Sequence, residues 1–243
     1  TVNMDSEIVQ DQNVRKAIEM GIDKEGFCSV IMEGRGIPAK GAFPGSFSYG
    51  NDAVETVSYD PEEAKKLLEE SGWTDTDGDG YVDKDGQKLT INWLTYPTRL
   101  EQPKLAEYAQ ATLKEIGIDV SVNNTSDHRT YAENGEFDVY VSSLTTAPTG
   151  DPEYFFSSTV TGSKNYGNYQ NDEVTKLTEQ LHQTFDTDER GKLAVELQQK
   201  ILDDDAYFFV SHLNMGIVTK ANVTGMAAHP CDYYEITADL DVQ

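Results

Sequence analysis

Short apolar runs alternate with longer amphipathic stretches through most of this chain. The runs rich in β-branched and aromatic residues, which are typical of buried strands, span 89–95, 118–122 and 137–144. Apolar residues at helical spacing predict helices over 102–116, 127–134, 172–185 and 187–205. This β-α-β-α order predicts an α/β fold with a mostly parallel sheet flanked by helices.

Two further helices are expected before the first of these strands. Apolar positions recur near helical spacing over 13–33, with an interruption at Gly21 and a suitable N-cap at Asp11 or Asn13. The second helix follows Asp60, a favourable N-cap, and ends at Gly72. A further apolar run at 207–218 has the composition of a long strand.

The strand predicted at 137–144 leads into a loop that is rich in hydroxyls, prolines and glycine. Ligand crevices in open α/β sheets lie at the carboxyl ends of strands. We therefore expect Thr145, Thr146 and Thr149 to offer hydroxyls to a polar ligand, although an ordinary Pro/Gly turn explains the same residues. Asp151 is expected to bond nearby backbone amides rather than the ligand.

Three more side chains are candidates for the same crevice. Tyr96 and Arg99 follow the neighbouring strand, and Arg99 can neutralise a carboxylate of the ligand. Of the four histidines, His212 is the best candidate for a ligand contact because it lies within the apolar 207–218 run. The remaining three, His128, His182 and His229, are scattered along the chain.

The segment 75–86 matches nine positions of a calcium-binding loop. The candidate metal residues are Asp75, Asp77, Asp79, Tyr81 and Asp83. The twelfth position, where a bidentate glutamate is expected, is a glycine, and a strand follows instead of a helix. A calcium site and a plain Asp/Gly-rich turn leading into a hairpin are both consistent with these residues.

Composition excludes several classes of function. The 243 residues carry a net charge of −24, which repels nucleic acid and anionic membranes. Cys28 and Cys231 match neither a zinc motif nor a disulfide framework. We find no catalytic motif and expect no enzyme.

The chain opens in what reads as the middle of a strand, which predicts a fragment of a longer protein.

Several motifs resemble the family 5 extracellular solute-binding proteins of ABC transporters. They are the segment from Asn13 to Lys24, the Tyr59–Trp73 segment, the 75–86 loop and the Asp151-Pro152 turn. Because they occur in the family's order, the resemblance covers residues 13–219. It implies a periplasmic-binding-protein-like lobe of type II, cluster C. Residues 1–206 would form the second, ligand-closing lobe, and 207–243 a hinge-crossing strand and a tail returning to a first lobe.

The resemblance also implies partners and a location. The chain would belong to the substrate-binding component of an importer, monomeric, with an ABC permease as its membrane partner. Such proteins are extracellular, either periplasmic or anchored as lipoproteins. No cofactor is required, but calcium in the 75–83 loop and nickel or a metal chelate as transported ligand are expected candidates.

The ligand class stays open between two members of the family. Peptide-binding members tend to carry an aspartate three residues before the Asp-Pro turn, where this chain has Pro148. That difference favours nickel or a metal chelate as the ligand. An oligopeptide or dipeptide is the alternative, and a calcium-dependent interaction module is a third interpretation.

Overall fold

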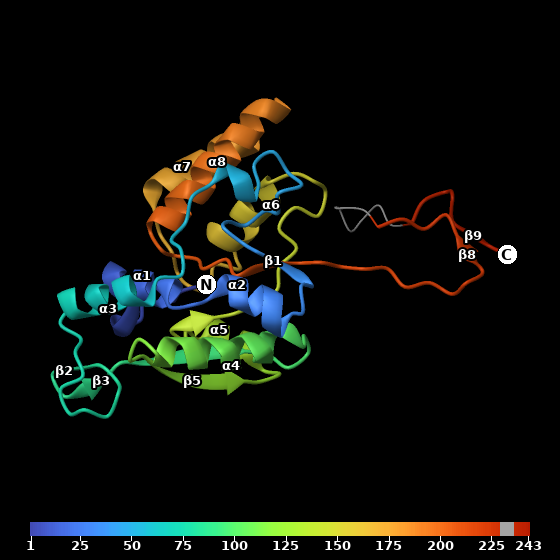
Figure 1. Ribbon diagram of the computed structural model, residues 1–243. Helices are drawn as coiled ribbons and strands as arrows, with labels where there is room; N and C mark the ends of the chain where they lie inside the picture. Colours follow the sequence, from blue (N-terminus) through green and yellow to red (C-terminus); the bar gives the residue numbers. More distant parts are fainter. Residues whose placement is uncertain (229–235) are drawn as a thin grey trace.

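A parallel three-stranded sheet forms the centre of the lower layer in Figure 1. This computed structural model describes residues 1–228 and 236–243, so His229 and Cys231 lie outside the described residues. The strand order is β5-β4-β6, with β4 (Thr90–Thr95) between β5 (Asp119–Asn124) and β6 (Val139–Tyr140). Both pairings of β4 are parallel, as the β-α-β-α pattern predicted.

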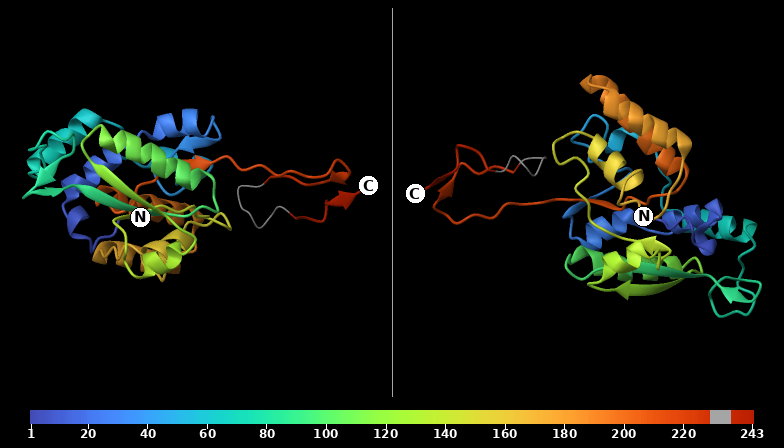
Figure 2. Two further views of the ribbon diagram at one scale, coloured as in Figure 1. Left: turned by 90° about the horizontal axis from the view of Figure 1, so that it is seen from below. Right: turned by 180° about the vertical axis from the view of Figure 1, so that it is seen from behind.

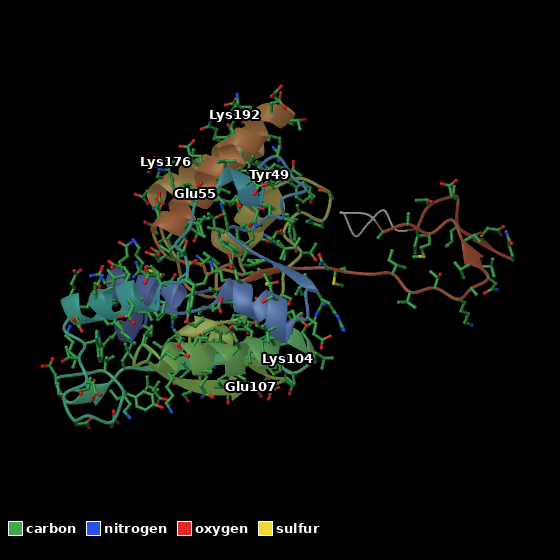
Figure 3. All side chains as sticks on the ribbon, in the orientation of Figure 1. Tyr49, Glu55, Lys104, Glu107, Lys176 and Lys192 are labelled. Atoms are coloured by element: carbon green, nitrogen blue, oxygen red, sulfur yellow. The ribbon has the colours of Figure 1, made fainter. Side chains whose placement is uncertain are left out.

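Helices cover both faces of this sheet because successive residues of β4 point to opposite sides. Ile91 and Trp93 pack in one core cluster with residues of α4 (Glu101–Lys114). Leu94 belongs to a second cluster with Ala132 of α5 (His128–Glu133). The exposed Lys104 and Glu107 lie along α4 in Figure 3, whereas the other stripe of this helix is buried.

The N-terminal part supplies a second pair of helices beside the sheet. α1 (Gln12–Met20) packs against α3 (Pro61–Glu70), and both add apolar side chains to the core cluster that contains Trp93. Asp11 caps α1 and Asp60 caps α3, since each carboxylate accepts a backbone N–H of the first turn. The predicted 13–33 helix is interrupted after Met20 and continues as α2 (Lys24–Gly26) and the π-helical turn η2 (Phe27–Ile31).

A helical unit lies above the sheet layer in Figure 1. It consists of α6 (Glu153–Phe155), the π-helical turn η4 (Phe156–Val160), α7 (Asp172–Gln183) and α8 (Thr187–Asp203). These elements share a core with Phe43 and Tyr49, which lie in the loop before η3.

Smaller elements complete the described fold. The 3₁₀ turns η1 (Glu7–Val9) and η3 (Asn51–Ala53) lie in the N-terminal part, and β2 (Asp83–Lys84) pairs with β3 (Gln87–Lys88).

Two predicted strands are shorter in the structure than in the sequence pattern. The 137–144 strand is reduced to β6, because β4 ends at Thr95 and offers its last ladder carbonyl, that of Leu94, to Val141. The 207–218 strand is reduced to β7 (Ser211–Leu213), which pairs antiparallel with β1 (Gly36–Pro38). Both predictions were wrong in length because strand length depends on a partner.

The chain leaves the folded body after β7. Figures 1 and 2 show the segment beyond β7 projecting away from the rest in all three views. Near its far end β8 (Val223–Thr224) pairs antiparallel with β9 (Asp241–Val242). Among the described residues no helix combines the length and the apolar character that crossing a membrane requires.

Candidate functional site

A cavity of about 390 Å³ opens at the carboxyl end of β4 and β6. Its wall combines the beginning of α4, the segment 141–147 that follows β6, and residues 207–213 around β7. These segments are far apart in the sequence, and the parallel sheet brings the first two to one edge. The cavity therefore occupies the position where the strand-end argument placed a ligand crevice.

The structure brings four of the six predicted ligand residues to this cavity. Arg99, Thr145, Thr146 and His212 line it. Tyr96 does not: its ring stacks on His128 at a centroid distance of 4.1 Å, and its hydroxyl accepts the Ser143 N–H. Thr149 is exposed and also lies outside the lining.

Arg99 and Thr146 differ in whether their side chains already have a hydrogen-bond partner. The Arg99 side chain is exposed and makes no hydrogen bond or ion pair with any described residue. The Thr146 hydroxyl instead donates to the backbone carbonyl of Ala42 at 2.9 Å. Thr146 thus joins the cavity wall to the loop before α3, while Arg99 presents an uncompensated positive charge.

His212 is held as a neutral imidazole with a defined tautomer. Its Nε2 lies 3.2 Å from Asn51 Oδ1, and burial lowers the pKa of His212 to about 4. Asn51 Nδ2 donates to the Pro38 carbonyl and its Oδ1 also accepts the Lys40 N–H, which fixes the amide orientation. Nε2 must therefore carry the hydrogen, and Nδ1 keeps its lone pair.

Sequence reasoning missed a chain of polar contacts at the beginning of α4. Gln102 Nε2 donates to Ser143 Oγ at 2.7 Å, and Ser143 Oγ donates to Glu101 Oε1 at 3.0 Å. All three residues line the cavity. Gln102 occupies a position on the buried stripe of α4 that Leu105 and Ala106 continue, and this polar residue in an apolar pattern is the signal that could have revealed it.

A second hollow, of about 880 Å³, lies on the side of the sheet near α5. The buried side chains of Asn3 and Asp138 in its wall are paired: Asn3 donates to the carbonyls of Gly135 and Phe137, and Asp138 accepts from Ser6 and from the Asn92 N–H. Because these two side chains already have partners, they do not require a ligand to complete their hydrogen bonds.

The 75–83 loop brings together part of the predicted metal set. Carboxylate oxygens of Asp75, Asp77 and Asp83 lie within 4.8 Å of one another. Asp79 is turned away to Lys88, with 2.6 Å between Oδ2 and Nζ, and Tyr81 lies under the same ammonium at 4.1 Å from its ring centroid. The loop thus presents three converging carboxylates rather than the five predicted residues.

Other contacts of the loop belong to the turn itself. Asp75 accepts the backbone N–H groups of Gly78 and Gly80, and Asp83 accepts the backbone N–H and the hydroxyl of Thr76. These bonds are what an Asp/Gly-rich turn makes without metal.

The chain resembles known solute-binding proteins over most of its length. The model for the middle part of the bacterial extracellular solute-binding proteins of family 5 matches residues 1–167. The oligopeptide-binding protein AppA of Bacillus subtilis is 32% identical over 96% of this chain and 45% of its own length. The nickel-binding periplasmic protein of Escherichia coli is 27% identical over 89% of this chain and 43% of its own length.

Solved structures agree with this assignment. AppA in complex with a nonapeptide superposes with a TM-score of 0.79 at 27% identity, covering 96% of this chain and 48% of that one. A nickel ABC transporter structure from Bacillus halodurans gives a TM-score of 0.79 at 28% identity, covering 100% of this chain and 51% of that one. The chain spans about half the length of the curated relatives it matches.

These similarities confirm the α/β periplasmic-binding-protein fold, and the relatives are solute-binding proteins rather than enzymes. The family acts outside the cytoplasm, either extracellularly or in the periplasm. This chain belongs to the bacterial extracellular solute-binding proteins of family 5.

Proposed function

We propose that the chain is part of the substrate-binding component of an ABC importer and that its cavity contacts nickel or a metal chelate. Residues 1–206 would form the ligand-closing lobe, and 207–243 would return to the other lobe. The whole protein would act as a monomer outside the membrane, in the periplasm or held by a lipid anchor, and deliver its cargo to a permease.

The observation that carries the proposal is the uncompensated charge of Arg99. The protein has a net charge of −24, yet this guanidinium lines the cavity without an ionic partner in the described part of the chain. A guanidinium binds carboxylates through paired, charge-assisted hydrogen bonds. Carboxylates are also the usual donors of small chelators, so Arg99 suits the anionic shell of a metal complex.

His212 supports the same class of ligand. Its Nδ1 lone pair is free for coordination because Nε2 is committed to Asn51. A neutral imidazole is a favourable ligand for nickel and other borderline metals. Thr145, Thr146 and Thr149 would add hydroxyl contacts near the rim, and Tyr96 would act through the Ser143 amide that it holds.

One specific observation favours a peptide as the alternative ligand. The segment 141–145 runs beside the cavity outside any described strand, and within it the Ser142 and Leu144 N–H groups have no hydrogen-bond partner among the described residues, so these two groups can pair with an extended peptide. The similarity to an oligopeptide-binding protein agrees with this reading. Both ligand classes must therefore be offered in the test.

The test is calorimetric titration of the protein, in the form in which cells make it, with Ni²⁺–citrate and separately with tri-alanine. Wild type should bind the nickel chelate, and Arg99→Gln should weaken binding about 10- to 100-fold, as expected for loss of a charged hydrogen bond. Arg35→Gln removes a guanidinium outside the cavity and should bind normally. Binding of tri-alanine alone would reject the nickel assignment.

A further inference from the structure

Two buried polar atoms of residues that line the cavity have no hydrogen-bond partner among the described residues. They are the indole Nε1 of Trp93 and the amide Oε1 of Gln102. Both residues line the cavity, and both are almost completely buried, at 1% and 3% exposure. Buried donors and acceptors are nearly always paired in folded proteins, so each unpaired one requires an explanation.

The orientation of the Gln102 amide is determined by its neighbours. The Ser143 hydroxyl has one hydrogen, which it gives to the Glu101 carboxylate, and its oxygen therefore accepts from Gln102. Only the Nε2 end of the amide can fill that position. Oε1 is thus left as the unpaired atom by the hydrogen-bond chain, and rotating the amide would place two acceptors against each other.

The two unpaired atoms have complementary chemistry. Trp93 supplies a donor from β4, and Gln102 supplies an acceptor from the first turn of α4. Neither is charged, and Arg99, which lies between β4 and α4, is exposed. A carboxylate here would meet the Gln102 acceptor, whereas a group that both donates and accepts would satisfy both atoms.

We propose that Trp93 and Gln102 form a neutral polar subsite in the wall of the cavity. It binds a group of the solute that donates a hydrogen bond to Gln102 Oε1 and accepts one from Trp93 Nε1, such as an imidazole, an amide or a hydroxyl. The carboxylates of the same solute remain near Arg99. This assignment rests on the proposed solute-binding function and specifies which solutes that site selects.

The experiment compares three probes on the protein as cells make it. Ni²⁺–L-glutamine carries an uncoordinated side-chain amide that donates and accepts, Ni²⁺–EDTA carries no hydrogen-bond donor, and tri-alanine carries amides. The variants are Gln102→Met, which keeps the length of the side chain, and Trp93→Phe, which removes the indole N–H. Gln110→Met makes the same substitution on α4 at a residue that bonds the Val120 carbonyl and does not line the cavity.

Each subsite variant should bind Ni²⁺–L-glutamine about 10-fold more weakly while binding Ni²⁺–EDTA within about 2-fold of wild type, since one hydrogen bond is lost only with the first probe. Gln110→Met should bind both chelates as wild type does, and thermal melting confirms that each variant is folded. Equal effects on both chelates, or no effect on either, would overturn the subsite and leave ordered water as the partner of these atoms.

Failure of the proposed function would give a different result from failure of the subsite. If wild type binds tri-alanine but neither chelate, the nickel assignment is rejected, and the subsite is judged on the peptide. A loss of about 10-fold with both variants then supports the subsite, because a peptide amide has the required donor and acceptor. Unchanged peptide binding overturns it, and so does a wild-type protein that binds none of the three probes.

Discussion

Arg190 holds both carboxylate oxygens of Asp151, with Nε 2.8 Å from Oδ2 and Nη2 2.6 Å from Oδ1. Asp151 also accepts the Glu153 N–H at 2.9 Å, the backbone bond that its place in the Asp-Pro turn predicted. Burial acts to raise the pKa of Asp151, but the hydrogen bonds from Arg190 and Glu153 outweigh it and keep the pKa below its usual value. The loop that follows the cavity wall is thereby fixed to α8.

Asp151→Ala should destabilise the protein by roughly 1–3 kcal/mol at pH 7, because Arg190 loses its bidentate partner. A carboxyl whose folded pKa is lowered contributes stability above its unfolded pKa and loses that contribution as the pH falls. The difference from wild type in urea unfolding should therefore shrink below about pH 4. A difference that stays constant from pH 7 to pH 3 would show that the carboxylate charge is not the cause.

Thr146→Val should lower stability even without ligand, by about 1–2 kcal/mol, because the buried Ala42 carbonyl loses its donor. Thr146→Ser keeps the hydroxyl and should melt close to wild type. Thermal unfolding of the unliganded protein makes this comparison. If the Thr146→Val and Thr146→Ser variants melt at the same temperature, the hydrogen bond to Ala42 does not contribute to stability. The Thr146 hydroxyl would then be available to the ligand.

Asp205→Asn should stabilise the protein at pH 7. Burial raises the pKa of Asp205 to about 6, above its unfolded value, so the stability it contributes is complete at low pH and is lost as the pH rises through about 6. Asparagine removes this loss and also tolerates the positive φ of 49° at this position. We expect a gain of about 1 kcal/mol at pH 7, after allowance for solvent screening, and a smaller gain at pH 4.

The same measurement on Asp203→Asn supplies the control, because that carboxylate is exposed in the same stretch of chain. Its urea midpoint should follow wild type at both pH values. An equal gain for both variants would point to relief of general charge repulsion rather than to burial of Asp205.

Calcium at 1 mM should leave the melting temperature unchanged. Asp79 is paired with Lys88, and the twelfth position of the loop is Gly86, so a calcium ion would lack two of its usual carboxylates. Asp77→Asn should likewise melt as wild type does. A rise of several degrees with calcium that Asp77→Asn abolishes would establish the metal site instead, since a ligand selective for the folded state raises stability.

Local patterns were sufficient for the helices and for the parallel sheet. Asp11 and Asp60 begin helices because a capping carboxylate acts within its own first turn, and the apolar stripe of α4 faces the sheet as its spacing predicted. The strand-end rule also located the cavity and placed Arg99 in its wall, whereas His212, which lines it too, was a candidate because of its apolar run.

What the sequence could not supply were pairings between distant segments. The lengths of β6 and β7 depend on where β4 and β1 end, which composition does not encode. The contacts of Thr146 with Ala42 and of Gln102 with Ser143 join residues separated by 104 and 41 positions. The periodicity of apolar residues does not identify contacts between distant residues. For that reason the sequence predicted Tyr96 at the crevice, whereas in the structure its ring stacks on His128.

The pairing of β1 with β7 also sets the order in which this protein can fold. Beside that pairing the Cys28 thiol donates to the Ser211 hydroxyl across 183 positions of chain. At ribosomal rates of 5–20 residues per second, β1 waits on the order of 10–40 s for its partner to be synthesised. Until then the backbone groups of β1 have no strand partner, so this two-stranded sheet forms only after all three strands of the parallel sheet have been synthesised.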